Sequence, residues 1–239
     1  MTTATREPRT ATGAVSRLAA ILTARGIDAS TASTPPSSPP VTALELADAR
    51  IPPRFRGALA DHPRVDAWVA EIARAGRPGP GGAPGIATGP SLLIAGPTGT
   101  GKTHQAYGAI RDLLAKGVRL RWEATTAADL YAAQRPQHGN DPEQQLWRLA
   151  RSPLLLLDDL GAAKSSEWTE ELTFRLLNWR CQNRLPTLIT TNLPPIADQR
   201  GHPQARVLRD MVGDRVLSRL SGMCEPVEFT GPDRRFAAA

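Results

Sequence analysis

Apolar residues along this chain form short continuous runs that alternate with longer stretches of helical periodicity. A short apolar run bounded by turn-forming residues predicts a buried strand, whereas apolar residues three and four positions apart predict a helix. Strands are expected in "SLLIAG" (91–96), "VRLRWEA" (118–124), "LLLL" (154–157), "PTLITT" (186–191) and "PVEF" (226–229). Helices are expected at 102–115, 126–134, 143–151, 167–183 and 205–221. This alternation predicts an α/β fold in three layers, a parallel five-stranded sheet with helices on both faces.

The first part of the chain differs from the rest. Residues 14–25 carry apolar side chains at helical spacing, and 28–40 are rich in Ser, Thr and Pro with almost no apolar content, which is typical of a linker. We expect a short N-terminal helical element that binds a partner (1–27), a Ser/Thr/Pro-rich linker (28–41) and one large domain (42–239). In that domain, further helices are expected near 42–49 and 64–75, and no regular structure in the Gly/Pro-rich stretch 76–90.

The composition narrows the class of protein. The chain has 239 residues, two cysteines and a formal net charge of +6. It has no run of eighteen apolar residues and its N-terminus has no apolar signal core, so we expect a cytoplasmic protein with reduced thiols and no membrane contact. The positive charge suits a nucleic-acid partner, but an ordinary basic protein has the same balance.

The stretch "GPTGTGKT" at 96–103 matches G-x-x-x-x-G-K-[ST] in full, between a predicted strand and a predicted helix. Glycines let the backbone wrap closely around phosphates, and the N–H groups at the start of the helix face their negative charge. Lys102 would reach the β- and γ-phosphates of ATP, and the Thr103 hydroxyl would bind Mg²⁺. The expected nucleotide-binding residues are Gly96, Pro97, Thr98, Gly99, Thr100, Gly101, Lys102 and Thr103.

Two later strands end in polar residues. In "LLLLDDLG", Asp158 would bind Mg²⁺ and Asp159 would polarise the attacking water, although acids at a strand end also form ordinary turns. In "PTLITTN", Asn192 would lie near the γ-phosphate and help to hold the same water if its strand lies between the other two, while "TNLPP" also suits a plain turn. Adjacent acids favour ATP hydrolysis over binding alone.

Near the C-terminus, "MVGDRVLSRLSG" places Arg215 and Arg219 one helical turn apart, on one side of a predicted helix. The predicted site lacks an obvious cation for the charge that develops on the γ-phosphate, which is the task of an arginine finger. A solvated basic helix face is the alternative interpretation.

These motifs together, in this order, resemble the DnaC/IstB branch of the AAA+ ATPases over about residues 90–230. The resemblance implies a P-loop NTPase with an AAA+ core but no helical lid, in which Arg215 and Arg219 complete the ATP site of a neighbouring subunit. It also implies that Ile51 and Phe55 border the adenine, and that hydrolysis is slow and depends on assembly or DNA. Only about ten residues follow the last predicted strand, which leaves no room for the helical lid of many AAA+ proteins, so no second sensor arginine is expected there.

The resemblance further implies a loader that binds a hexameric replicative helicase and single-stranded DNA. An IstB-like transposition helper is the nearest alternative, and a nucleotide-dependent adaptor with negligible hydrolysis is one from another class. Positively charged side chains and aromatic rings after the second predicted strand could together bind single-stranded DNA, with the rings stacked on its bases. The candidates are Arg119, Arg121, Trp122, Tyr131 and Arg135, and the alternative is that Trp122 belongs to the core and the arginines are solvated.

Overall fold

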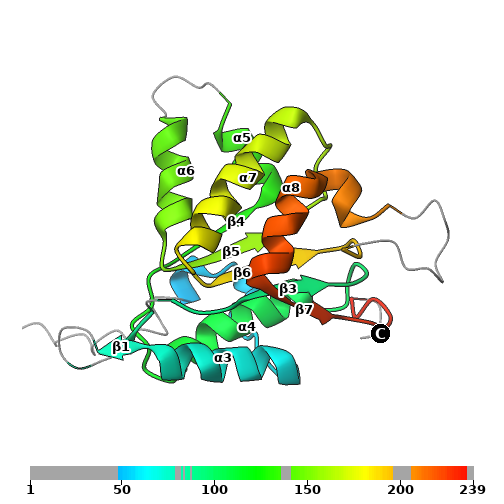
Figure 1. Ribbon diagram of the computed structural model, residues 1–239. Coiled ribbons are helices and arrows are strands. Elements are labelled where there is room, and N and C mark those ends of the chain that lie inside the picture. The colour runs from blue at the N-terminus through cyan, green and yellow to red at the C-terminus, as the bar shows by residue number, and fades with distance from the viewer. Residues whose placement is uncertain are drawn as a thin grey trace, which may run out of the picture. The chain divides into compact units, whose positions relative to one another are not determined.

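Figure 1 shows the computed structural model of the chain, which describes residues 48–78, 82, 84–86, 88–135, 141–195 and 206–235. All of these residues belong to the unit Thr42–Ala239. The predicted N-terminal element (1–27), the linker (28–41) and most of the helix expected near 42–49 lie outside the described residues. No helix in the described part of the chain is long and apolar enough to cross a membrane.

The described residues are organised around a parallel sheet of five strands, ordered β4-β5-β6-β3-β7. The strands are β3 (Ser91–Ala95), β4 (Trp122–Thr126), β5 (Leu154–Asp158), β6 (Thr187–Thr191) and β7 (Cys224–Glu228). Both β3 and β6 are buried along their whole length, because helices cover both faces of the sheet. The three-layer α/β prediction is confirmed, and β6 lies between β3 and β5, as the Asn192 hypothesis requires.

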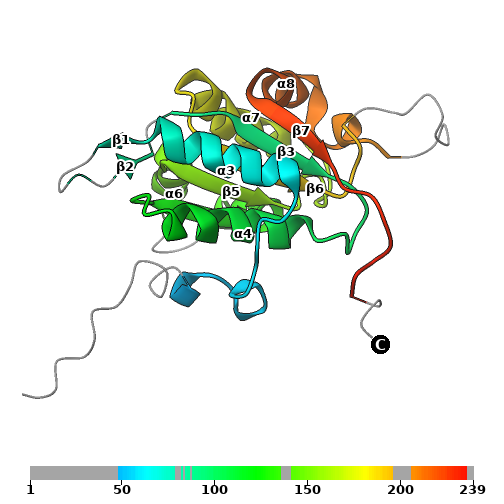
Figure 2. The same cartoon turned by 90° about the horizontal axis from the view of Figure 1, so that it is seen from below.

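The helices form two layers, one on each face of the sheet (Figures 1 and 2). One layer contains α3 (Pro63–Ala75) and α4 (Lys102–Ala115), whose apolar sides pack into one core cluster. The other contains α5 (Ala127–Ala133), α6 (Pro142–Arg151), α7 (Glu167–Gln182) and α8 (Leu208–Met223), which share the second cluster. A short 3₁₀ turn, η1 (Pro53–Phe55), precedes α3.

Three expectations are corrected. Strand β4 begins at Trp122 rather than at Val118, because its partner β5 begins at Leu154, opposite Trp122. The stretch 76–90 contains a short antiparallel pair, β1 (Arg77–Pro78) and β2 (Pro84–Gly85).

The third correction concerns α8. This helix is interrupted at Gly213, where φ is 81°, so two helical segments replace the single helix expected at 205–221. A Cβ at that position would lie 2.3 Å from the carboxyl carbon of Glu170 on α7. The break therefore depends on both the left-handed backbone and the close approach of α7, which only glycine accommodates.

The Arg180 side chain anchors the amino ends of β5 and β6 to α6. It is fully buried, and its guanidinium donates to the carbonyl oxygens of Leu149, Ser152 and Pro186 at 2.6–3.0 Å and to Thr187 Oγ1 at 2.8 Å. Burial lowers the pKa of Arg180 to about 9, so the side chain is still charged at neutral pH. One cation thus supplies donors to two segments, 149–152 and 186–187, that are far apart in the sequence.

We expect Arg180→Met to lower the free energy of unfolding by about 3 kcal/mol or more, because buried acceptors left without a donor cost about 1–3 kcal/mol each. Urea denaturation of the purified variant measures this loss. The matched control is Arg175→Met on the same helix, whose partner Glu143 is exposed, so its loss should stay below about 1 kcal/mol. Equal losses in the two variants would contradict the role assigned to Arg180.

Candidate functional site

The loop 96–101 connects the carboxyl end of β3 to the first turn of α4. Helix α4 has Gly101 at its N-cap and no side-chain cap, so its first N–H groups remain directed at the loop interior. The Lys102 side chain is buried, and its Nζ donates to the Pro97 carbonyl oxygen at 2.7 Å. Burial lowers the pKa of Lys102, while the carboxylates of Asp159 and Asp158 oppose that shift. The loop thus encloses a cation beside two acids.

The Asp158 carboxylate at the end of β5 joins two other elements. Its Oδ1 accepts hydrogen bonds from Thr103 Oγ1 on α4 at 2.9 Å and from Thr190 Oγ1 on β6 at 2.5 Å. Burial raises the pKa of Asp158, and the neighbouring charge of Asp159 raises it further, whereas the two threonine hydroxyls act in the opposite direction. A cation at this point would offset the cost of burying the charged carboxylate.

Asp159 adopts a backbone conformation that is unusual for a residue with a side chain. Its φ is 53°, in the left-handed region, which costs about 1 kcal/mol or more outside glycine. Its N–H donates to Thr190 Oγ1 at 2.9 Å, and its Oδ1 accepts from Asn192 Nδ2 at 3.3 Å. Because β6 lies next to β5, the amide and the carboxylate meet at the same edge of the sheet.

These groups line a cavity of about 600 Å³. Its lining comes from η1, the loop after β3, the start of α4, the ends of β5 and β6, and the C-terminal stretch after β7. The lining residues are Arg54, Phe55, Thr98, Gly99, Gly101, Lys102, Thr103, His104, Asp158, Asp159, Asn192, Arg234 and Arg235.

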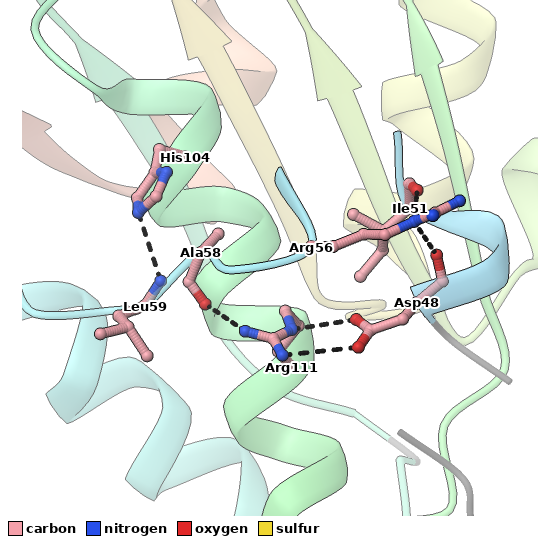
Figure 3. A network of polar contacts seen from close by, with 7 residues as sticks. All are labelled: Asp48, Ile51, Arg56, Ala58, Leu59, His104 and Arg111. Atoms are coloured by element: carbon pink, nitrogen blue, oxygen red, sulfur yellow. Dashed lines mark hydrogen bonds and ion pairs between the residues drawn. The ribbon is translucent and has the colours of Figure 1, made fainter. Parts of the chain in front are cut away.

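The segment before α3 is held against α4 by the contacts shown in Figure 3. Arg111 on α4 donates to the Asp48 carboxylate at 3.0 Å and to the Ala58 carbonyl oxygen at 2.9 Å, and the Leu59 N–H donates to His104 Nε2 at 3.3 Å. These contacts fix η1 at the mouth of the cavity.

The two expected adenine neighbours, Phe55 and Ile51, lie in different surroundings. The Phe55 ring stacks on Tyr107 with centroids 5.0 Å apart, and Phe55 lines the cavity. Ile51 is 1% exposed and packs in the core beneath α4. Phe55 therefore remains a candidate for a base contact, whereas the expectation for Ile51 is corrected: it is a core residue.

Arg215 and Arg219 share one aromatic platform. Their guanidinium carbons lie 4.0 Å and 5.6 Å from the centre of the Phe174 ring on α7. Arg215 also pairs with Glu171 Oε2 at 3.2 Å, and Arg219 donates to Asn178 Oδ1 at 2.8 Å. Both arginines thus lie on one side of α8, as their spacing predicts, and neither lines the cavity described above. Sequence reasoning missed Phe174.

Residues 86–237 match the family of IstB-like ATP binding proteins. The chain belongs to this IstB-like family. Its relatives include the replicative helicase loader DnaC of Escherichia coli strain K12, which is 26% identical over 133 residues, or 54% of this chain and 49% of DnaC.

A second relative is the replicative helicase loader DnaI of Bacillus subtilis strain 168, 28% identical over 98 residues, or 39% of this chain and 31% of DnaI. The IstB-like chain thus spans half or less of the length of these curated relatives. The crystal structure of the DnaC helicase loader is similar with a TM-score of 0.57 at 26% identity, covering 74% of this chain and 99% of that one. The AAA+ type of core expected from the motifs is confirmed.

The predicted DNA-contacting residues of this IstB-like chain do not form one surface. Trp122 is 4% exposed, with the Arg50 guanidinium 4.6 Å from its ring centre. Tyr131 is 9% exposed, and its hydroxyl is hydrogen-bonded to Thr173 Oγ1 at 2.7 Å. We correct the expectation that these rings stack on bases, because both side chains are buried. Arg121 and Arg135 are exposed, but Arg121 directly precedes β4 and Arg135 follows the end of α5.

Arg119 is also exposed and precedes β4, where it forms an isolated bridge with Gly85. Sequence reasoning missed four cavity residues as well: Arg54, His104, Arg234 and Arg235. The last two line the cavity from the stretch after β7, where no second sensor arginine was expected. The turn "GPDRR" directly after the last strand was the available signal.

We expect Asp158→Asn to raise the melting temperature in Mg²⁺-free and nucleotide-free buffer at neutral pH. The amide keeps an oxygen for Thr103 and Thr190 and removes the buried charge. Each kcal/mol gained shifts the melting temperature of a domain of this size by about 2–4 °C. Since the pKa of Asp158 is raised in the folded state, the parent protein loses stability as the pH rises through that pKa.

The advantage of the variant should therefore vanish in acid, where the parent carboxyl is neutral. Thermal unfolding at several pH values checks both statements. A variant that melts below the parent protein at neutral pH would show that the carboxylate stabilises the fold through its charge, contrary to this interpretation.

Proposed function

We propose that this IstB-like chain is an ATP-dependent loader of a replicative DNA helicase. The observation that carries the proposal is its similarity to DnaC, both over 133 residues of sequence and over almost the whole DnaC crystal structure. DnaC is named as a replicative helicase loader, and the cavity of this chain is lined by the residues to which we assign roles in binding ATP: Lys102, Thr103, Asp158, Asp159 and Asn192.

Nucleotide binding begins with the loop after β3. The N–H groups at the start of α4 and the Lys102 ammonium would face the β- and γ-phosphates. Thr103 and Asp158 suit Mg²⁺, because a hydroxyl and a carboxylate oxygen 2.9 Å apart are hard oxygen donors directed into the same cavity. No group of three or more His, Cys, Asp or Glu side chains suited to a metal occurs among the described residues, so the remaining ligands would be phosphate oxygens and water.

Mg²⁺ bound there would neutralise charge that develops on the phosphate oxygens. Asp159 and Asn192 would hold the attacking water between them, with the carboxylate as its proton acceptor. The strained backbone of Asp159 supports this role, since such conformations are concentrated at functional sites. The amide of Asn192 already fixes one oxygen of that carboxylate.

The two arginines on α8 would act on a neighbouring subunit. Arg215 is exposed and Arg219 is partly exposed, and both are held parallel by Phe174 rather than by the cavity of their own chain. Arginine fingers supplied by a second molecule accelerate phosphoryl transfer by about 10³–10⁵-fold. We infer that an isolated subunit hydrolyses ATP slowly and that self-association completes the site.

The partners belong to the same proposal. The N-terminal element (1–27), carried by the linker (28–41), would bind the helicase, and the exposed Arg121 and Arg135 would contact single-stranded DNA through its phosphates. The family description, an IstB-like ATP binding protein, favours a transposition helper as the second candidate. That function would use the same ATPase core with a transposase in place of the helicase.

The test of the loader is binding to the replicative helicase of the same organism. Full-length protein with ATP should co-elute with the helicase in size-exclusion chromatography, and deletion of residues 1–40 should abolish co-elution while ATP affinity is unchanged. Co-elution with a purified transposase but not with the helicase would establish the alternative. Helicase binding that survives the deletion would place the interface on the ATPase core.

The shared site is tested by mixing. Lys102→Ala subunits retain their arginines, and Arg219→Ala subunits retain an intact cavity, so each should be nearly inactive alone and a mixture should recover part of the steady-state ATP hydrolysis. Arg209→Ala is the matched control on α8, because Arg209 pairs with the exposed Asp214 and not with Phe174. If subunits that demonstrably associate show no recovery, the trans role of Arg219 is wrong.

A further inference from the structure

The stretch that follows β7 runs along the nucleotide cavity instead of leaving the fold. At its start, the Phe229 N–H donates to the Ala95 carbonyl oxygen at 2.7 Å, and the Phe229 ring stacks on His62 with centroids 4.6 Å apart. At its end, the Arg234 N–H donates to the Gly99 carbonyl oxygen at 3.0 Å. We call residues 229–235 the C-terminal strap; it is the red segment beyond β7 in Figure 2.

The strap packs directly on the phosphate loop at Gly99. A Cβ on Gly99 would lie 1.9 Å from the carboxyl carbon of Asp233, and the φ of Gly99 is 82°. Only a residue without a side chain allows this approach. The Asp233 carboxylate also accepts from the Arg235 N–H at 2.9 Å, which turns the strap at this point. The loop and the strap are therefore in backbone contact, and the contact fixes where the two following arginines lie.

Both arginines face the cavity that Lys102 and the acids line. The Arg234 guanidinium lies near the turn into α4, with Nη1 3.6 Å from a Cβ placed on Gly101. Arg235 is close enough to Lys102 for its charge to help lower the pKa of that lysine. Side chains this exposed carry no evident structural task. Lys102, Arg234 and Arg235, together with Arg54 of η1, thus line the cavity in which the phosphates of a nucleotide would lie.

We propose that the strap supplies Arg234 and Arg235 as phosphate-binding cations in cis, and that they distinguish ATP from ADP by contacting the γ-phosphate. The proposal rests on the ATP site proposed above and adds a second, intramolecular source of positive charge to it. Guanidinium groups suit this task, because they stay charged and bind phosphate oxygens through paired hydrogen bonds. ADP lacks the phosphate that these side chains would contact.

The experiment is isothermal titration of the full-length chain with ATP and with ADP, each in the presence of Mg²⁺. In Arg234→Ala/Arg235→Ala, ATP affinity should fall about ten- to hundredfold, as expected for lost charge-assisted hydrogen bonds. ADP affinity should change less than about threefold. Replacement of both residues by Lys should recover part of the ATP affinity. The melting temperature without nucleotide should stay at the parent value, which a merely structural strap would not predict.

Two further variants make the outcome decisive. Arg74→Ala on α3 also removes an exposed arginine and should bind both nucleotides like the parent protein. Lys102→Ala should lose ATP binding, and a parent protein that binds no ATP would refute the ATP site itself. If the parent protein and Lys102→Ala behave as expected but the double variant binds ATP like Arg74→Ala, the strap proposal fails. Equal losses of ATP and ADP affinity would also overturn the γ-phosphate contact.

Discussion

One carboxylate oxygen, Oδ1 of Asp158, accepts hydrogen bonds from two hydroxyl groups that come from different elements. Thr103 brings the first turn of α4 to it, and Thr190 brings β6. Because β6 lies beside β5 in the sheet, Thr190 is within reach of Asp158. Burying this charge is unfavourable by itself. The fold therefore keeps the Asp158 carboxylate in an unfavourable environment. Such strain is concentrated at functional sites, where a bound ligand can offset it.

Two sets of positively charged side chains bear on the proposed function. Arg54, Lys102, Arg234 and Arg235 line the cavity of their own chain. Arg215 and Arg219 are turned to another surface by the Phe174 ring. The first set suits ground-state binding of a nucleotide, because it is present in every subunit. The second set suits control of hydrolysis, because under the proposed function it acts only when a neighbour is in place.

Local patterns predicted the parts of this structure that depend on local chemistry. The start of α4 at Lys102 and the burial of β5 follow from a glycine-rich loop and a run of four leucines, and both were expected. The break at Gly213 could not be foreseen, since it requires Glu170 of another helix to approach the backbone. The same holds for Trp122, whose burial depends on Arg50 and Tyr107 from distant parts of the chain.

The candidate site shows the same division. Gly96–Thr103, Asp158, Asp159 and Asn192 were found because each motif ends a strand of a parallel sheet, so their meeting at one edge follows from topology. Arg234 and Arg235 were missed because their position depends on a backbone contact with Gly99, which is more than 130 residues away in the sequence. Motif spacing along the sequence does not predict a contact of this kind.

The buried guanidinium of Arg180 gives α7 a mechanical property. It joins the C-terminal end of that helix to the end of α6, to Ser152 and to the start of β6 by hydrogen bonds, so a tilt of α7 would pivot there. Phe174 lies six residues nearer the N-terminus, about 9 Å along the axis. A small rotation of α7 about Arg180 would displace the Phe174 ring. Arg215 and Arg219, which pack on that ring, would move with it. Under the proposed function these are the arginines that a neighbouring subunit requires, so their position would depend on the tilt of α7.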